Sequence, residues 1–391
     1  AGNLRCFKII NFPHLNMKIA IVCYPTFGGS GVVATELGIE LTKRNHEVHF
    51  ITYSQPVRLA LLNKNIHYHE VVVPEYPLFH YQPYELALSS KIVDTVKEYG
   101  IDLLHVHYAI PHAFAGYMAK QMLAEQGISL PMVTTLHGTD ITLVGNHPFY
   151  KTAVSFSINQ SDYVTSVSAD LKKSTYELFD TTKEIHVIPN FIEDKNVTHV
   201  QCKRNLFAED GERIVTHVSN FRKVKRILDV VKVFNGIQKE MPAKLMMVGD
   251  GPERLGAEEL VKELGIENKV IFFGNSSEID SILKYSDLFL LPSETESFGL
   301  AALEAMANKV PVISSNTGGL PEVNVQGVSG FMDNIGDIDG MVQHAIEILK
   351  DDVTLQEFKE QAYAHSKNFS VDKIVPLYEA IYNKALKNTL V

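Results

Sequence analysis

The most specific pattern of chemically useful side chains is a pair of carboxylates, Glu296 and Glu304, separated by seven residues. A helix is predicted to begin between them, near Phe298, so that Glu296 precedes the helix and Glu304 lies in its second turn. Eight helical residues span about 12 Å, which suits contacts at two ends of an extended ligand better than a carboxylate dyad. The unpaired N–H groups at the helix start favour an anion between the two side chains. A helix with two solvated glutamates is the alternative, although Glu304 lies among Ala, Leu and Met residues.

A basic segment could supply the positive charge that such an anion needs. The stretch Val218-Ser-Asn-Phe-Arg-Lys-Val-Lys-Arg226 places four cations within five residues, after a predicted strand. Guanidinium and ammonium groups on a loop that enters a helix can hold a pyrophosphate, and a solvated basic turn is the alternative. The whole chain is acidic, with 36 Lys and Arg against 46 Asp and Glu and a net charge of −10. This balance argues against general nucleic-acid binding and against an anionic membrane surface as a partner.

A glycine-rich turn comes after the first predicted strand. The segment Tyr24-Pro-Thr-Phe-Gly-Gly-Ser-Gly31 leads into a predicted helix, where Gly28 and Gly29 would let the backbone approach a ligand at the helix N-terminus. The pattern Gly29-x-Gly31-x-x-Ala34 also fits a dinucleotide fingerprint, so a nicotinamide-dependent oxidoreductase is an alternative. That fingerprint needs an acidic residue after the second strand, which ends His-Phe-Ile-Thr-Tyr-Ser-Gln without one. A tight turn that binds nothing is a third interpretation.

A histidine and an aspartate occur together in the turn His137-Gly-Thr-Asp140, after the apolar strand predicted over 131–136. Imidazole in such a place can hydrogen-bond a sugar hydroxyl or a developing charge. Equally, Asp140 could cap the next helix and His137 could bond a backbone carbonyl. His105 and His107 lie at another strand end, where at least one of them is expected to be structural. The sixteen histidines show no metal-ligand spacing, so no metal centre is predicted.

Short apolar runs alternate with helical segments, and this alternation predicts two parallel sheets. Many runs are rich in Val and Ile with little alternation, as expected of strands covered on both faces. The predicted strands are 18–23, 47–52, 66–72, 101–106, 131–136, 163–167, 185–188, 213–219, 244–248, 270–273, 288–291 and 311–314. The predicted helices include 32–44, 84–99, 113–125, 227–239, 258–264, 279–284, 300–307 and 371–386. The predicted fold class is therefore α/β, with two doubly wound Rossmann-like domains facing each other across a cleft.

The length of 391 residues is enough for two domains. We expect a leader over 1–16, a first domain over 17–192, a second over 193–370 and a helix over 371–391 that crosses back to the first domain. A polar stretch predicts a hinge near 191–200. Because ligands of open parallel sheets bind beyond the carboxyl ends of the strands, we expect the site in the cleft between the domains.

The cysteine count and the hydropathy of the chain indicate its redox compartment and whether a membrane is a partner. Cys6, Cys23 and Cys202 are an odd number without Cys-x-x-Cys spacing, which indicates neither a disulfide framework nor a zinc ribbon. This usage fits the reducing cytoplasm. No apolar run approaches the roughly 20 residues that a membrane span requires, so no membrane partner is expected.

The glycine turn, the HGTD turn, the basic loop and the E-x7-E element followed by Ala-Met resemble, in order and placement, the retaining glycosyltransferases of family 4. The resemblance covers residues 17–387 and implies the GT-B fold. Within the family, CYPTFGGSGVVATELG, VTTLHGTDIT and VSNFRKVKR are similar to members that transfer N-acetylglucosamine from UDP-N-acetylglucosamine to the hydroxyl of L-malate, the first step of bacillithiol biosynthesis. Another small acceptor, a sugar or an inositol phosphate, is an alternative, as is a non-catalytic sugar-binding module.

The resemblance also implies roles for individual residues. Glu296 would bind hydroxyls of the donor sugar, Glu304 the ribose of UDP, and His137 the transferring sugar. The other donor contacts would be Gly28, Gly29, Arg222, Lys225 and the backbone N–H groups of Phe298, Gly299 and Leu300. The catalytic set would be His137, Glu296, Arg222 and Lys225. Where the family usually has Gly-Arg, this chain has Ser219-Asn220, and Arg222 lies two positions further along.

The implied reaction is a front-face displacement in which the departing phosphate takes the acceptor proton. It requires positioning and charge stabilisation, and Arg, Lys and helix N-termini supply positive charge, so neither a metal nor another cofactor is expected. An L-malate acceptor needs hydrogen-bond donors in the first domain, for which the candidates are Ser30, Arg58, Tyr108 and Thr134. A surface arginine and ordinary buried hydroxyls are the alternative. The resemblance also suggests a homodimer.

Overall fold

The protein is described from a computed structural model of the chain, which covers residues 16–26, 28–59, 63–75, 77–78, 80–193, 204–276 and 278–389. The leader predicted over 1–16 lies outside these residues except for Asn16. Most of the hinge predicted near 191–200 lies outside them as well.

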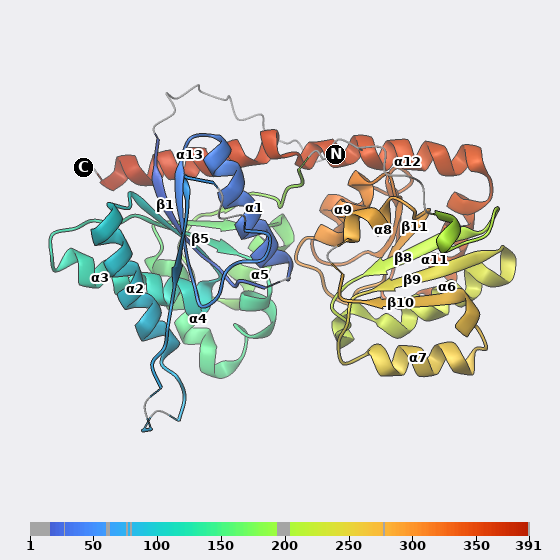
Figure 1. Cartoon of the computed structure of the whole chain (residues 1–391), viewed down its shortest axis with the longest axis horizontal. Coiled ribbons are helices and arrows are strands. Elements are labelled where there is room, and N and C mark those ends of the chain that lie inside the picture. Colours follow the sequence, from blue (N-terminus) through green and yellow to red (C-terminus); the bar gives the residue numbers. More distant parts are fainter. Residues whose placement is uncertain are drawn as a thin grey trace.

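The first half of the chain forms a seven-stranded parallel sheet with helices on both faces (Figure 1). The strand order is β3-β2-β1-β4-β5-β6-β7, so the chain changes direction across the sheet between β1 and β4. The strands are β1 (Lys18–Val22), β2 (Glu47–Thr52), β3 (Ile66–Glu70), β4 (Leu103–His107), β5 (Met132–Leu136), β6 (Tyr163–Ser166) and β7 (Ile185–Val187). The helices are α1 (Gly29–Lys43), α2 (Tyr84–Tyr99), α3 (Phe114–Ala124), α4 (Pro148–Gln160) and α5 (Ala169–Leu178), with single turns η1 (Ala109–Ala113) and η2 (Thr139–Leu143).

The second half forms a six-stranded parallel sheet in the order β10-β9-β8-β11-β12-β13. Its strands are β8 (Arg213–Val218), β9 (Ala243–Val248), β10 (Val270–Gly274), β11 (Leu288–Leu291), β12 (Val312–Ser315) and β13 (Gly330–Asp333). Its helices are α6 (Ile227–Glu240), α7 (Arg254–Glu263), α8 (Ile279–Leu283), α9 (Leu300–Ala307), α10 (Leu320–Val323), α11 (Ile338–Leu349) and α12 (Asp352–Ser366). Short 3-10 turns are η3 (Arg204–Leu206), η4 (Lys223–Lys225), η5 (Glu267–Lys269) and η6 (Lys367–Phe369). The predicted fold class of two parallel-sheet α/β units is confirmed; strand β13, with only the apolar pair Phe-Met, was not predicted.

The sheet strands are buried because helices cover both faces. In β1, Ile19, Ala20 and Ile21 are fully buried; helices α1 and α13 (Val371–Thr389) pack on one face of the first sheet, and α2 and α3 pack on the other. Helix α1 lies so close to the sheet that a Cβ at Gly38 would overlap the ring of Phe50. Among the described residues, no helix combines the length and apolar character that a membrane crossing needs.

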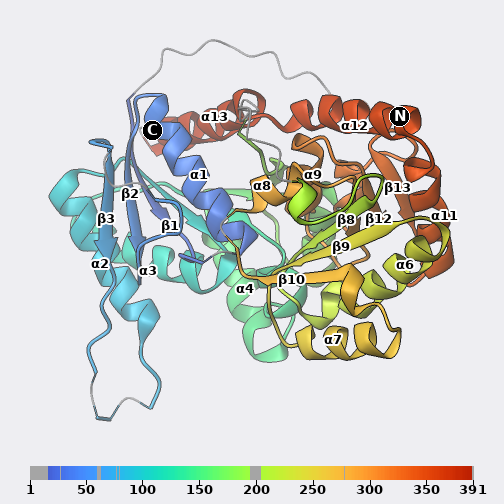
Figure 2. The ribbon, with the colours of Figure 1, turned by 45° about the vertical axis from the view of Figure 1, so that its right-hand side comes forward.

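The last two helices run along both sheets, α12 over the second and α13 over the first (Figures 1 and 2). Tyr378 and Tyr382 of α13 are fully buried. The two crossings between the sheets lie side by side, because Ile192 donates its N–H to the carbonyl of Phe369 (3.0 Å) and accepts from the N–H of Val371 (3.2 Å). The chain therefore passes between the sheets twice at one place.

Two glycines inside helices offer a test of this packing. Gly38→Ala should lower the thermal midpoint, because overpacking against Phe50 costs about 1–3 kcal/mol, more than the helix gains by losing a glycine. Gly256→Ala in α7 is the matched control, since the nearest atom to its Cβ, in Leu228, would be 3.8 Å away. That variant should be neutral or more stable by about 1 kcal/mol. Equal midpoints for the two variants in thermal denaturation would contradict a close approach of Gly38 to Phe50.

Candidate active site

The segments that come after the central strands of the two sheets are in direct contact. A Cβ at Gly29, the first residue of α1, would lie 3.6 Å from Leu300 Cδ2 at the start of α9. A Cβ at Gly138, after β5, would overlap Ser297 Oγ. The glycine turn and the HGTD turn of the first sheet therefore meet the E-x7-E segment of the second, as expected of a site between the two sheets.

Asp140 fixes the HGTD turn. Its buried carboxylate accepts hydrogen bonds from the backbone N–H groups of His137 (3.1 Å), Gly138 (2.9 Å) and Ala109 (2.9 Å). Two donors come from its own turn and the third from the segment after β4, so one side chain ties together the ends of neighbouring strands. Burial raises the pKa of Asp140 to about 6, while the three N–H groups oppose that shift. Asp140 is a positioning residue that sets the place of His137.

His137 is a neutral imidazole within this turn. Its Nε2 lies 2.8 Å from Nδ1 of His107, and its ring stacks on Tyr108 with 5.3 Å between centroids. Burial lowers the pKa of His137 to about 3, and His112 adds to the effect. The ring can therefore exchange hydrogen bonds with a hydroxyl near pH 7 but does not act there as a cation.

The other histidines of this cluster support His137 from inside the sheet. His105 is fully buried, with Nδ1 2.8 Å from the Tyr382 hydroxyl and Nε2 2.7 Å from Thr135 Oγ1. His107 is the residue that holds the ring of His137. The sequence indicated that at least one of His105 and His107 is structural, and His105 fills that role by joining α13 to the sheet.

Two predicted acceptor residues meet at the start of α1. The hydroxyls of Ser30 and Tyr108 are 2.9 Å apart, and Tyr108 has a positive φ of 86°, which aims its ring toward α1 rather than along the strand. Burial raises the pKa of Tyr108, and Arg222 of the second sheet is among the groups that lower it.

The other two predicted acceptor residues lie elsewhere. Thr134 is fully buried inside β5, where its hydroxyl lies 2.7 Å from that of Ser161. Because Ser161 follows the last residue of α4, the Thr134 hydroxyl points toward the end of that helix. Arg58 pairs with Glu36 of α1, which is six residues and about 9 Å along the helix from Ser30. The structure therefore does not bring Thr134 or Arg58 to the group formed by Ser30 and Tyr108.

One cation of the basic loop of the second sheet lies beside the E-x7-E segment. Lys225 Nζ lies 2.5 Å from Glu296 Oε1, which also accepts from Ser293 Oγ at 2.8 Å. Arg222 is exposed, and Arg226 pairs with Asp229.

The E-x7-E segment differs from its prediction at the helix start. Helix α9 spans Leu300–Ala307, as predicted for the helix over 300–307, and begins two residues after the start expected near Phe298, with Gly299 as its cap at φ 97°. Glu296 therefore lies on a loop, and the eight residues to Glu304 are only partly helical. Glu304 is half-buried in the second turn of α9, and the Phe298 side chain is buried against Phe369, 5.7 Å between ring centroids. Phe298 can therefore offer a ligand its backbone N–H but not its ring.

One contact between the sheets gave no signal in the sequence. The carboxylate of Glu322, in α10, accepts from the backbone N–H groups of Ala169 (2.9 Å) and Asp170 (3.0 Å) at the start of α5. The partners are about 150 residues apart, so spacing could not have linked them. This contact caps a helix of the first sheet from the second.

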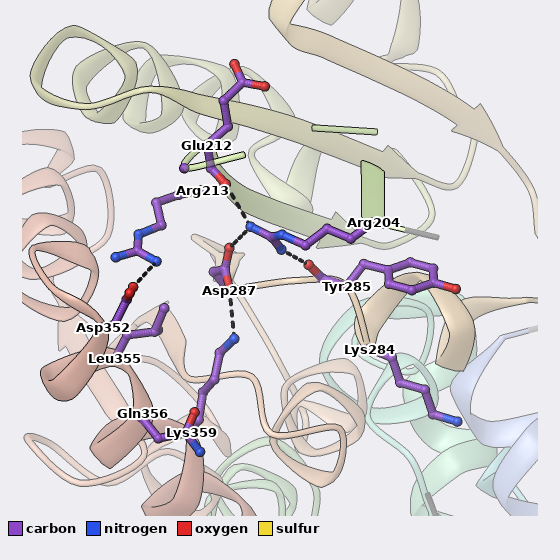
Figure 3. A pocket seen from close by; sticks show the side chains of 11 residues that line it. Arg204, Glu212, Arg213, Lys284, Tyr285, Asp287, Asp352, Leu355, Gln356 and Lys359 are labelled. Carbon is purple, nitrogen blue, oxygen red and sulfur yellow. Dashed lines mark hydrogen bonds and ion pairs between the residues drawn. The ribbon is translucent and has the colours of Figure 1, made fainter. Parts of the chain in front are cut away.

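A hollow of about 440 Å³ lies at the opposite end of the second sheet, at the amino ends of β8 and β11 (Figure 3). Its arginines and one lysine are paired: Arg204 with Asp287 (2.6 Å), Lys359 with Asp287 (2.8 Å) and Arg213 with Asp352 (2.8 Å). Although burial opposes it, Lys359 and Arg204 lower the pKa of Asp287. This network joins η3, β8, β11 and α12 and is structural.

Two parallel sheets whose carboxyl ends meet, with a glycine turn on one side and a cationic loop beside a carboxylate on the other, define a GT-B glycosyltransferase. Residues 27–196 match the family model "Glycosyltransferase Family 4", and residues 201–365 match "Glycosyl transferases group 1". The chain is 46% identical over 378 residues to N-acetyl-alpha-D-glucosaminyl L-malate synthase of Bacillus anthracis, covering 96% of this chain and 98% of that protein. The chain therefore belongs to glycosyltransferase family 4, and the resemblance stated from the sequence is confirmed.

Solved structures show the same fold at low identity. HepE of Anabaena, in complex with UDP and glucose, has a TM-score of 0.79 at 19% identity, covering 94% of this chain and 100% of that one. Sucrose-phosphate synthase of Thermosynechococcus elongatus has a TM-score of 0.78 at 20% identity, covering 95% and 100%. The family membership removes the oxidoreductase interpretation of the Gly29 turn.

The role given to Asp140 can be tested by Asp140→Asn. The amide keeps one acceptor oxygen but turns an N–H group toward the N–H of Ala109, so the turn should shift and misplace His137. We expect glycosyl transfer to slow by about 10- to 100-fold, or about 1.4–2.7 kcal/mol in barrier, with UDP affinity unchanged by calorimetry. Asp180→Asn, at an exposed position, is the control. Transfer at the native rate in Asp140→Asn would mean that Asp140 does not position His137.

Proposed function

We propose that this protein transfers N-acetylglucosamine from UDP-N-acetylglucosamine to the hydroxyl of L-malate, with retention at the anomeric carbon, in the first step of bacillithiol biosynthesis. The observation that carries the proposal is the near full-length match, at 46% identity, to the Bacillus anthracis synthase. The contact between the HGTD turn and the loop before α9 supports it, because the groups proposed to bind the sugar and the phosphates would then lie within one site.

The donor would bind chiefly to the second domain, over 193–370. Arg222, Lys225 and the N–H groups of Phe298, Gly299 and Leu300 would hold the pyrophosphate, with Gly28 and Gly29 closing on it from the first domain. Glu296 would bind hydroxyls of the sugar, and Glu304 those of the ribose. The bond between Lys225 and Glu296 supports this assignment, since it keeps a phosphate-binding cation beside a sugar-binding carboxylate.

In the proposed step, the bond between the anomeric carbon and the β-phosphate oxygen breaks while the malate hydroxyl oxygen bonds to that carbon from the same face. The malate proton passes to the departing phosphate oxygen, so no protein group is consumed. Glu296 is engaged by Lys225 and Ser293, which suits binding rather than nucleophilic attack. Lys225, Arg222 and the α9 N-terminus would stabilise the negative charge on the leaving UDP, the role that a metal ion plays in other transferases.

The first domain, over 17–192, would hold L-malate, with helix α13 packed against it. Ser30 and Tyr108 would donate hydroxyl hydrogen bonds to its carboxylates, aided by the N–H groups at the start of α1. Arg222, on the basic loop of the second sheet, would add a cation. Arg58 and Thr134 are left out of this set because of where their side chains lie.

The proposed setting is the cytoplasm, where a reducing medium keeps the buried Cys23 thiol reduced, and the proposed assembly is a homodimer. Sedimentation of the purified chain would show a single species of twice the chain mass.

The acceptor is tested by product analysis. Incubation with UDP-N-acetylglucosamine and a panel of hydroxy acids, sugars and inositol phosphates, followed by mass spectrometry, should give a glucosaminyl malate with α configuration by NMR. Transfer to another acceptor with malate inert would overturn the malate assignment but leave the transfer chemistry in place. Release of no UDP with any acceptor would overturn the transferase itself.

Two substitutions separate the proposed roles of the carboxylates. Glu304→Ala should weaken UDP binding about 10- to 100-fold, because hydrogen bonds to a charged acceptor contribute about 1.5–3 kcal/mol. Glu296→Ala should leave UDP affinity within about twofold but reduce turnover strongly, since its contacts are to the sugar. Glu259→Ala, exposed on α7, is the control. Native UDP affinity in Glu304→Ala, measured by calorimetry, would contradict its assignment to the ribose.

A further inference from the structure

A cluster of histidines lies on strands β2 and β3 of the first sheet. Strand β3 is the edge strand and β2 is its neighbour (Figure 2). The sequences are Glu47-Val-His49 on β2 and His67-Tyr-His69 on β3, and His49 pairs in register with His67. Because side chains two residues apart in a strand share a face, all four chemically active side chains project from the same side of the sheet. The i, i+2 spacing on two paired strands differs from the i, i+4 spacing of the histidines in the helical His-Glu-x-x-His motif.

The distances within this cluster match those between the ligands of one metal ion. Glu47 Oε1 lies 3.1 Å from His49 Nε2 and 3.3 Å from His67 Nε2, and one ligand atom from each of the three lies within 4.8 Å of the others. Ligands about 2.0–2.1 Å from a tetrahedral Zn²⁺ are about 3.3 Å apart. Small side-chain adjustments would therefore suffice to place an ion between them.

The surroundings of the cluster suit an ion as well. His49 Nδ1 lies 2.9 Å from His69 Nε2, so a His49 that binds metal through Nε2 could donate its Nδ1–H to His69, the outer hydrogen bond that orients most metal-binding histidines. The ring of Tyr99 covers the cluster, 4.8 Å from His49 and 4.9 Å from His69 between centroids.

Solvent access to the cluster and the charge of neighbouring Lys18 also affect the binding of an ion. His49 is fully buried, whereas the side chains of Glu47 and His67 are 31% and 34% exposed, so an ion can enter from solvent. Lys18 lies 3.6 Å from Glu47, but on Oε2, and its Nζ also donates to the Tyr99 carbonyl at 3.0 Å. Oε1 is thus the oxygen of Glu47 that is turned toward the histidines. Lys18 holds the Glu47 carboxylate in this orientation, although its positive charge also repels a bound cation to some extent.

We propose that Glu47, His49 and His67 bind one divalent transition-metal ion of the Zn²⁺ class, with water in the fourth position and His69 as the outer partner of His49. Two imidazoles and a carboxylate favour zinc over calcium or magnesium. Glu47 begins β2, at the amino end of the strand, whereas the active site lies beyond the carboxyl ends. The ion therefore joins an edge strand to its neighbour and takes no part in glycosyl transfer.

The test uses the full chain, purified without a histidine tag and stripped with a chelator. Competition between the protein and a chromophoric zinc indicator should give one Zn²⁺ per chain. Adding Zn²⁺ should raise the thermal midpoint, because an ion that binds only the folded state stabilises it. Co²⁺ should give the visible absorption of a four-coordinate site.

Variants then separate a metal site from a hydrogen-bonded cluster. Glu47→Gln and His67→Ala, at partly exposed positions, should lose high-affinity binding and the midpoint increase, and His69→Asn should weaken binding by about 10- to 100-fold. His80→Ala, at an exposed histidine, should bind as the native chain does. Glycosyl transfer should be the same in all four variants and with or without the ion. No stoichiometric binding, or native binding in Glu47→Gln and His67→Ala, would overturn the proposal.

Discussion

The approach of the Gly138 backbone to Ser297 is the contact on which the rest of the site depends. Position 138 has φ 114°, and a Cβ there would overlap Ser297 Oγ, so a glycine is required on both counts. This approach brings His137, carried by the first sheet, beside the loop that carries Glu296. Asp140 then holds the turn by its own backbone and by that of Ala109. The active site is thus built from two sheets whose backbones touch.

The electrostatics of the site arise from the ends of elements rather than from the overall charge. The chain has a net charge of −10, yet Lys225 and the N-termini of α1 and α9 converge on one region. Partial positive charge at helix ends and full charge on the basic loop create a local field that an anion would feel. His137 is neutral, since burial lowers its pKa. The local positive field therefore comes from the basic loop and the helix ends and not from His137.

The fold class and the meeting of Lys225 with Glu296 could be predicted from the sequence because each rests on local patterns. Apolar runs define the strands, and the parallel topology places the loops after those strands at one edge of the sheet. The partners of Arg58 and Thr134 could not be predicted, because a sequence does not show which hydroxyl is already bonded inside a sheet or which carboxylate an arginine prefers. Predicting the cluster of Glu47 and His49 would have required the register of β2 against β3. That register depends on packing far from either strand. Predicting the contact of Glu322 with Ala169 and Asp170 would have required the relative placement of both sheets.

The paired crossings at Ile192 and Phe369 have a mechanical consequence. Two chain segments that are joined by hydrogen bonds bend together about one line. They therefore resist twisting better than a single linker does. Because the buried Tyr378 and Tyr382 fix α13 to the first sheet, any displacement of the second sheet relative to the first would have to bend both crossings together. The pair of crossings therefore restricts the relative motion of the two sheets, and with it the separation of Ser297 from Gly138, more than one linker would.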